Sequence, residues 1–434
     1  ITTNDDSGTD AHVYIDGGTT ALVIATSTID GDLELASGHA SGITDSGTVT
    51  VGGNLAATTY ANDGVINLDT LAVADGMVLE THGSGNATVV NDAGFFFTDL
   101  DSEVGGNLSV TATTGNISDN HDGSVTVAGT SSFTTSANNA TITLDDTGNS
   151  FAGAVSLNTT GSSGHATVDG GTTALNIAAS SVGGNLTLTS GNSITDSGTV
   201  TVGGWLIATT DANNGAINLG TLAVDAGIHL NTHGTGNATA VNDAGFLFGG
   251  NGSTVGGNLN VTATTGNMTD NNDGLVTVAG TSSFTTSANN ADIILDDTNH
   301  AFTGAVALNT TGSTGNATID NGTTALDVAA SSVGGNLTLT SGNSITDSGT
   351  VTVGGNLAAT TDANNGLINL GTLAVDGTVQ LTTNGTGNAT VVNDAGLNLA
   401  ASTVGGNFAA TATTGNMTDS GALAITGTTT LTTS

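Results

Sequence analysis

The feature that most constrains this chain is a five-residue motif, Val-Gly-Gly-Asn-Leu, which recurs along the sequence. Six copies are identical, one has Trp in place of Asn, and one has Phe in place of Leu. Glycine allows a tight turn, and the apolar residue after Asn starts a run in which apolar and polar residues alternate. The motif therefore predicts a strand end, a turn and a strand start. Its copies begin at Val51, Val104, Val182, Val202, Val255, Val333, Val353 and Val404.

The motif is part of a longer period. Val51, Val202 and Val353 open equivalent segments and are separated by 151 residues. This spacing defines full modules at 48–198 and 199–349, with partial modules at 1–47 and 350–434. Because similar segments follow one another directly, we expect residues 1–434 to form a single continuous repeat segment of a longer chain.

Each module divides into shorter units of about 25 residues, each with three short alternating runs. Alternation of period two, with many Thr and Val residues, favours strands, and the frequent Gly residues disfavour helix. The sequence therefore predicts an all-β fold, a right-handed parallel β-helix (β-solenoid) with three short strands per coil of about 25 residues and about 17 coils. Leu71, Val73, Leu79 and Val89 are expected to face inward. A string of antiparallel β-sandwich domains is the alternative, but no linkers divide the modules.

Composition excludes several functions. The 434 residues include no Lys, Arg, Cys or Pro, and the formal charge is −37. Binding to nucleic acid requires basic residues that neutralise phosphates, and binding to an anionic membrane surface requires them too. Neither partner is therefore expected. No stretch approaches the roughly 20 apolar residues of a membrane helix, so membrane insertion is not expected. Because aromatic residues make up only 3 %, we expect a core of Val, Leu, Ile, Ala and Thr.

The carboxylates recur at equivalent positions, as in Asp45, Asp196 and Asp347. We expect most of them to cap turns by accepting backbone hydrogen bonds. Catalysis by paired carboxylates is disfavoured, because the pattern returns in every module and the chain has no Lys or Arg. A cation site is the alternative, since clustered oxygen ligands suit Ca²⁺, the one cofactor that we consider. Its candidate ligands are Asp119, Asp122, Asp145, Asp146, Asp296 and Asp297.

Two polar residue types vary with the repeat. Histidine exchanges with Asn between modules, as His300 does with Asn149, so histidine metal sites are not expected. The Asn after Gly-Gly is expected to form a ladder of amide hydrogen bonds at a corner. Trp205 replaces Asn54 and Asn356 at this corner. An aromatic side chain there would stack on a glycan or on a neighbouring filament.

The run from Val333 to Gly349, Val-Gly-Gly-Asn-Leu-Thr-Leu-Thr-Ser-Gly-Asn-Ser-Ile-Thr-Asp-Ser-Gly, resembles the repeats of filamentous-haemagglutinin-like secreted proteins. The resemblance implies an exported bacterial protein with a β-helical shaft, located at the cell surface or outside the cell. We therefore expect a non-enzymatic structural shaft or filament. Its expected partners are other copies of itself, with which it would form fibres, or neighbouring coils of the same long chain. The alternative is an adhesin or glycan-binding module that meets a polysaccharide or a host surface.

Overall fold

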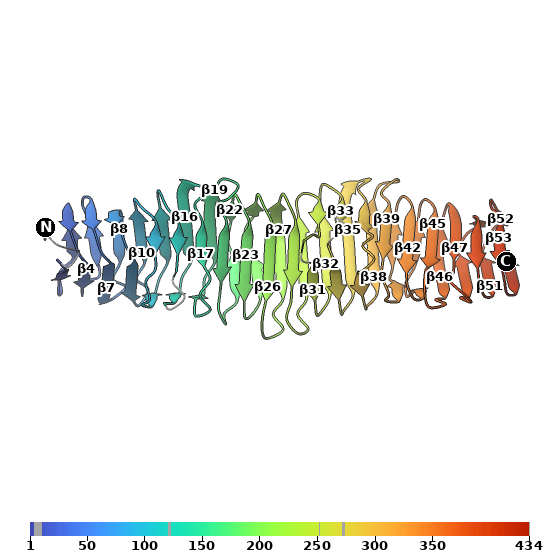
Figure 1. Cartoon of the computed structure of the whole chain (residues 1–434), viewed down its shortest axis with the longest axis horizontal. Coiled ribbons are helices and arrows are strands. Elements are labelled where there is room, and N and C mark those ends of the chain that lie inside the picture. The colour runs from blue at the N-terminus through green and yellow to red at the C-terminus, as the bar shows by residue number, and fades with distance from the viewer. Residues whose placement is uncertain (4–10, 120–122, 251, 271–273, 434) are drawn as a thin grey trace. The chain divides into compact units, whose positions relative to one another are not determined.

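The computed structural model describes residues 1–3, 11–119, 123–250, 252–270 and 274–433, which form strands and turns but no helix (Figure 1). The chain is a parallel β-solenoid of about 19 turns with roughly 22 residues per turn. It divides into two compact units, Ile1–Ala226 (unit 1) and Gly227–Ser434 (unit 2). Since the described residues contain no helix, none of them forms an apolar helix long enough to cross a membrane.

The strands of unit 1 belong to three faces. The first face consists of β1 (Val13–Asp16), β4 (Leu33–Ser37), β7 (Leu55–Asn62), β9 (Met77–His82), β12 (Ser102–Val104), β15 (Val125–Val127) and β18 (Ser150–Phe151). The second consists of β2 (Leu22–Ile24), β3 (Ser27–Ile29), β5 (Ile43–Asp45), β6 (Val49–Val51), β8 (Ile66–Val73), β10 (Ala87–Asn91), β13 (Leu108–Ala112), β16 (Ser131–Asn138), β19 (Val155–Thr160), β21 (Leu175–Ile177), β22 (Ser180–Val182), β24 (Ile194–Asp196), β25 (Val200–Val202) and β27 (Ile217–Val224). The third consists of β11 (Phe95–Phe96), β14 (Ile117–Ser118), β17 (Ile142–Leu144), β20 (Ala166–Asp169), β23 (Leu186–Ser190) and β26 (Leu206–Thr210).

The strands of unit 2 also belong to three faces. One consists of β29 (Ala238–Asn242), β32 (Leu259–Ala263), β35 (Ser282–Asn289), β38 (Val306–Thr311), β40 (Leu326–Val328), β41 (Ser331–Val333), β43 (Ile345–Asp347), β44 (Val351–Val353), β46 (Ile368–Val375), β48 (Ala389–Asn393), β51 (Phe408–Ala412) and β54 (Thr429–Thr433). The second consists of β28 (Ile228–Asn231), β31 (Ser253–Val255), β34 (Val276–Val278) and β37 (Ala301–Phe302). The third consists of β30 (Phe246–Leu247), β33 (Met268–Thr269), β36 (Ile293–Leu295), β39 (Ala317–Asp320), β42 (Leu337–Ser341), β45 (Leu357–Thr361), β47 (Thr378–Thr382), β49 (Leu397–Leu399), β50 (Ser402–Val404), β52 (Met417–Asp419) and β53 (Leu423–Ile425).

Successive turns stack strand on strand. β13 pairs in parallel with β16, and β16 with β19, so each of these strands meets the third strand along the chain. The same spacing holds for β12, β15 and β18 on the neighbouring face. Three strands per turn and a parallel β-solenoid are therefore confirmed, and the antiparallel sandwich is wrong. In Figure 1 the arrow of β16 lies beside that of β19.

The turn is shorter than the sequence predicted, at roughly 22 residues in place of about 25. One cause is that some strands run through a corner without a break. β8 pairs with β5 through Ile66 and with β6 through Leu71, so one long strand lies beside two short ones. A turn with such a long strand has fewer than three alternating runs. Assigning three runs to every turn therefore includes residues of the next turn and makes the predicted turn too long.

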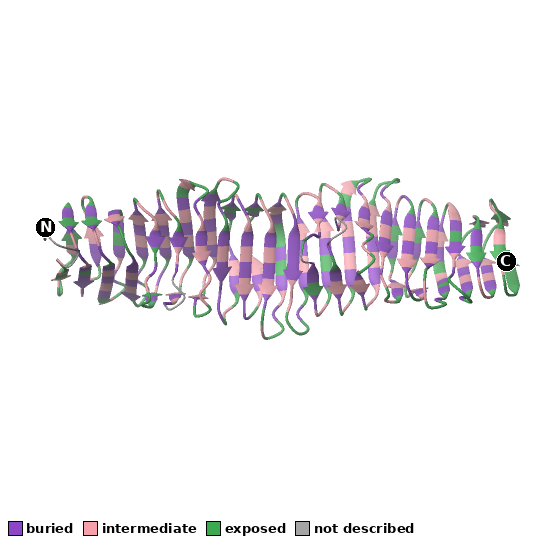
Figure 2. Ribbon diagram, viewed as in Figure 1, coloured by how far each residue is buried: buried purple, intermediate pink, exposed green. Residues whose placement is uncertain are grey.

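The core lies inside the turns, where every second side chain of a strand is buried. Figure 2 shows buried bands alternating with less buried ones along the strands. Leu71, Val73, Leu79 and Val89 are at most 2 % exposed, so their predicted inward orientation is confirmed. This alternation follows from strand geometry, because successive side chains point to opposite faces.

Phenylalanine corrects the expectation of a core made only of smaller residues. Nine of the ten phenylalanines are among the largest fully buried side chains. They contact one another between turns: the rings of Phe284 and Phe302 are 5.4 Å apart and edge-to-face, a favourable aromatic geometry. The core is therefore built mostly of Val, Leu, Ile and Ala, as predicted, with nine buried Phe side chains added to it. The exception is Phe96, which is 37 % exposed.

Candidate functional site

The Asn residues after Gly-Gly form the predicted ladder between turns. Asn107 Oδ1 accepts the N–H of Thr130 at 2.8 Å, and the N–H of Asn107 donates to Oδ1 of Asn86, an Asn that follows a single Gly, at 2.7 Å. Unit 2 repeats the arrangement, where Asn336 Oδ1 accepts the N–H of Asn356 at 2.8 Å. Each amide therefore satisfies a backbone donor that the strand ladder leaves free at a corner.

The glycines of the motif are needed because this corner is crowded. A Cβ on Gly106 would lie 2.5 Å from Asn86 Oδ1 and closer still to the carbonyl oxygen of Ser84. Only a residue without a side chain lets the preceding turn approach this closely. The motif is thus a packing device between turns as well as a turn signal.

The recurring Asp residues cap corners, as predicted, but their donors lie in the next turn. Asp196 accepts the N–H of Gly220 at 2.9 Å through Oδ1 and the N–H of Thr221 at 2.7 Å through Oδ2. Asp347 does the same with Gly371 and Thr372. These carboxylates therefore join one turn to the next.

Asp119, a candidate calcium ligand, is buried at 8 % exposure and points inward. Its carboxylate accepts the N–H groups of Asp145 and Asp146 at 3.2 and 3.3 Å, and the side-chain amide of Asn149 at 2.7 Å. Burial raises the pKa of this carboxyl, while the three hydrogen bonds act in the opposite direction. The structure therefore gives Asp119 a role in joining turns.

The other candidate cation ligands lie at exposed or half-buried turns. Asp146 Oδ1 accepts the N–H of Gly148 at 2.6 Å, and Asp297 Oδ1 accepts the N–H of Asn299 at 2.8 Å. Asp145 is half-buried and Asp296 is exposed, and Asp122 lies outside the described residues. Within the described part of the chain, no three acidic or histidine side chains are grouped so that they could hold a metal ion. Calcium binding stays a prediction of the sequence.

Trp205 occupies the corner where Asn stands in other turns. Its backbone N–H donates to Asn185 Oδ1 at 3.0 Å, so it takes the same place in the ladder. The residue is half-buried, and an indole has no acceptor with which to continue the ladder. Contact of this side chain with a glycan or a filament stays a prediction.

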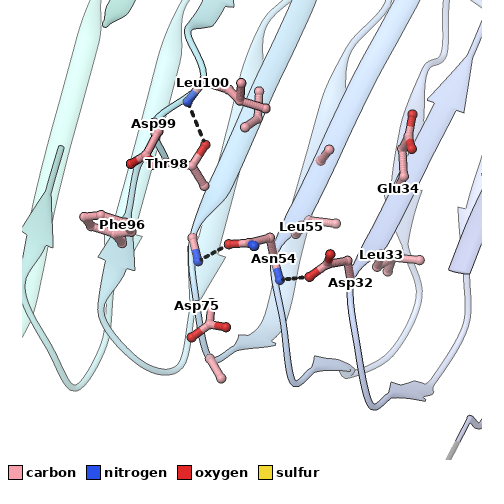
Figure 3. Close-up of a pocket in the computed structure, with 14 residues that line it drawn as sticks. Asp32, Leu33, Glu34, Asn54, Leu55, Asp75, Phe96, Thr98, Asp99 and Leu100 are labelled. Carbon is pink, nitrogen blue, oxygen red and sulfur yellow. Dashed lines mark hydrogen bonds between the residues drawn. The ribbon is translucent and has the colours of Figure 1, made fainter. Parts of the chain in front are cut away.

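Sequence reasoning missed a groove on unit 1, which we call the acidic groove (Figure 3). Its volume is about 780 Å³, within the usual range of ligand sites. Neighbouring turns contribute its rim, so that residues far apart in sequence meet. The residues that characterise it are the carboxylates Asp32, Glu34, Asp75 and Asp99 and the apolar side chains Val78, Phe96 and Leu100.

Corner bonds fix the walls of the acidic groove. Asp32 Oδ1 accepts the N–H of Asn54 at 2.7 Å, and Asn54 Oδ1 accepts the N–H of Gly76 at 3.0 Å. The N–H of Leu100 donates to Thr98 Oγ1 at 3.2 Å, as Figure 3 shows. The groove is therefore built on the same ladder that stacks the turns.

The sequence carried one signal for this groove: its four acidic residues are replaced by uncharged residues at the equivalent positions of the next module. Asp32 and Glu34 correspond to Asn185 and Thr187, 153 residues later. Asp75 and Asp99 correspond to Ala226 and Gly250, 151 residues later. All four carboxylates are therefore special to the first copy, although the surrounding pattern repeats.

Comparison with known families gives one match. A family model described as "Repeats of unknown function" (DUF5649) matches residues 10–78, 84–158, 163–233, 235–309, 314–370 and 386–434. The chain belongs to this family. The DUF5649 matches starting at 84, 235 and 386 are 151 residues apart, so one period of 151 residues corresponds to two DUF5649 repeats. No curated protein and no solved structure matches the chain.

Proposed function

We propose that this DUF5649 chain is a non-enzymatic structural shaft of an exported protein. The observation that carries the proposal is that polar side chains at the corners bond to the next turn. Asn107, Asp196 and Asn336 each accept a backbone N–H of the following turn at 2.7 to 2.9 Å. Stacked repeats gain most of their stability from such contacts between neighbours. The function of such a shaft would depend on its length and stiffness.

Removing one module tests the shaft. Deletion of residues 48–198 joins Gly47 to Thr199, which restores the Gly-Thr sequence found at Gly198-Thr199. At roughly 22 residues per turn and about 4.8 Å per turn, the particle should shorten by roughly 33 Å in electron micrographs. Duplication of residues 48–198 should lengthen it by the same amount. Unchanged particle length in both variants would overturn the proposal.

The proposed location is the cell surface or the extracellular space. Support comes from the resemblance of Val333–Gly349 to repeats of filamentous-haemagglutinin-like proteins, together with the β-solenoid fold. Protease added to intact producing cells should degrade the chain if it is exposed there. Protection of the chain until the cells are lysed would contradict this location.

Self-association is proposed as the contact that a shaft would make, through strand edges. Adjacent turns of one chain already join by parallel pairing, as β51 does with β54, and two copies would join in the same way. Sedimentation velocity should then show larger species as concentration rises. A single monomeric species across the concentration range would argue against it.

A further inference from the structure

One surface of unit 1 departs from the repeat in composition. The chain has three glutamates, Glu34, Glu80 and Glu103, and two tyrosines, Tyr14 and Tyr60. All five lie on β1, β4, β7, β9 and β12, which are strands of one face. Glu34 pairs in register with Tyr14, and Glu80 with Glu103. The acidic groove lies on this face and includes Glu34.

Exposed apolar side chains make the groove different from an ordinary acidic surface. Phe96 is 37 % exposed and Leu100 is 66 % exposed. Phe96 is the only phenylalanine outside the set of fully buried ones, and its counterparts in the next two copies are Leu247 and Asn398. A large ring held at the surface of a groove is available to cover the apolar part of a ligand.

The charge of the groove is available as well. Glu34 and Asp75 are exposed and accept no hydrogen bond from the residues that the structure describes. Asp32 is less available, because its Oδ1 accepts the N–H of Asn54 and its Oδ2 lies 3.1 Å from Nδ1 of His12. Carboxylates beside an aromatic face form a site for a guanidinium or ammonium group, which gains both ionic and cation–π attraction.

We propose that the acidic groove binds a basic segment of a second protein, in which Arg or Lys alternates with apolar residues. The carboxylates of Glu34 and Asp75 would pair with the cations, and Phe96 and Leu100 would cover the apolar side chains. Another copy of these 434 residues does not fit, because it contains no Lys or Arg and has a charge of −37. The inference adds a partner to the shaft and does not depend on the shaft proposal.

A synthetic peptide tests this occupant. The probe is a fluorescent Gly-Arg-Leu-Arg-Leu-Arg-Gly peptide, with a Glu-for-Arg version and a Gly-for-Leu version as comparisons. Anisotropy is measured on the full chain at 0.15 M salt, where the Debye length of about 8 Å suppresses attraction to distant charges. We expect binding of the Arg-Leu peptide, weaker binding of the Arg-Gly peptide and none of the Glu-Leu peptide.

The groove variant uses only residues that the sequence itself contains one repeat further on. It combines Asp32→Asn, Glu34→Thr, Asp75→Ala and Asp99→Gly, which replace the four groove carboxylates by their natural counterparts. Its affinity should fall by about tenfold or more, because the carboxylates that attract the three Arg residues of the peptide are lost together. The matched control removes four exposed carboxylates of unit 2, through Asp243→Asn, Asp362→Asn, Asp376→Asn and Asp394→Asn. It changes the net charge equally and should retain affinity within about twofold.

The apolar half of the site has its own test. Phe96→Asn introduces the residue of the third copy. It should weaken the Arg-Leu peptide several-fold and the Arg-Gly peptide less, because the Arg-Gly peptide loses only the cation–π attraction. Leu367→Asn, at a site in unit 2 that is 40 % exposed, is the control and should change neither. Equal losses in the groove variant and the four-Asn control would overturn the proposal, since general charge would then explain binding. Binding of neutral oligosaccharides in place of the peptide would overturn it too.

Discussion

The imidazole of His300 lies 2.8 Å from the carboxylate of Asp270, with Nε2 facing Oδ2 and both side chains at most 2 % exposed. On its other side His300 Nδ1 accepts the N–H of Val276 at 3.0 Å. Because Nδ1 accepts, the ring proton is on Nε2 and is donated to Asp270. In unit 1 Asn149 does both tasks, accepting the N–H of Val125 and donating to Asp119. Histidine and asparagine exchange here because each offers one acceptor and one donor.

This equivalence predicts that His300→Asn is tolerated and that His300→Leu is not. Leucine would remove the imidazole donor from the buried Asp270 carboxylate, which would keep the N–H of Asp297, and would leave the Val276 N–H without its acceptor. This should lower the free energy of unfolding by about 3 kcal/mol. Asparagine should cost less than about 1 kcal/mol, because it reproduces both bonds. Urea unfolding of the two variants measures the difference. Equal stability of the two variants would show that neither bond matters.

The stacked phenylalanines predict that the loss of stability on replacing a Phe by Ala depends strongly on where that Phe lies. Phe284 is fully buried between Phe248, at 6.1 Å, and Phe302, at 5.4 Å between ring centroids. Phe284→Ala should lower the free energy of unfolding by about 3–5 kcal/mol, because it removes apolar contacts and leaves a cavity. Phe96→Ala, at the exposed position, should cost less than about 1 kcal/mol. Thermal unfolding of both variants tests this, and similar losses would contradict the assigned burial.

The fold could be predicted from the sequence because burial in a strand has a period of two, which the residues display directly. Leu71 and Val89 show this, since their alternation alone placed them in the core. The turn length could not be obtained in this way, because the number of strands per turn varies. The single strand β8 lies beside both β5 and β6, which are separate strands in the preceding turn. The nine buried Phe side chains were missed because amino-acid composition does not say which way a side chain points.

The candidate site was harder to predict, because it depends on which turns lie side by side. Asp32, Asp75 and Asp99 are far apart in sequence and meet only through the stacking of turns. Asp119 was one of the candidate cation ligands, as were Asp145 and Asp146, yet its carboxylate accepts the backbone N–H groups of those two residues. Hydrogen bonds between turns therefore decide which carboxylates remain available, and a linear motif does not contain that information.

The Asn ladder predicts that an acceptor, and not an amide as such, is required at the corner. Asn107 Oδ1 accepts the N–H and the hydroxyl of Thr130 at 2.8 and 3.1 Å. Asn107→Ala should lower the free energy of unfolding by about 1 kcal/mol, because the Thr130 N–H loses its partner. Asn107→Asp should retain most of the stability, as Asp32 already serves this role for Asn54. Denaturant unfolding distinguishes the two, and an Asp variant as unstable as the Ala variant would refute the acceptor role.

The acidic turn at Asp145 and Asp146 provides the test of calcium binding. If Ca²⁺ binds these carboxylates, the melting temperature should be higher in Ca²⁺ than in chelator, because a ligand of the folded state stabilises it. The difference should disappear in the double variant Asp145→Asn, Asp146→Asn and persist in Asp243→Asn, a carboxylate of unit 2. Identical melting temperatures with Ca²⁺ and with chelator would remove the prediction.

Two carboxylates with opposite pKa shifts predict opposite effects of pH. Burial raises the pKa of Asp169, whose Oδ1 accepts the N–H of Gly171 at 2.7 Å. Its contribution to stability is therefore full below the unfolded-state pKa of about 3.9 and is lost as pH rises through the folded-state pKa. Asp169→Asn keeps an acceptor for Gly171 and carries no charge, so its melting temperature should exceed that of the natural chain at pH 7 and approach it near pH 3.

Asp63 is the matched control, because the hydroxyl and N–H of Ser84 lower the pKa of its carboxyl. Its stabilising contribution is present above the unfolded-state pKa and is lost as pH falls through the folded-state pKa. Asp63→Asn should therefore melt below the natural chain at pH 7, with the difference shrinking towards acidic pH. Melting curves of both variants at several pH values between 3 and 7 measure this. A difference of the same sign for the two variants at pH 7 would contradict the assigned environments, since burial and hydrogen bonding act on a carboxylate in opposite directions.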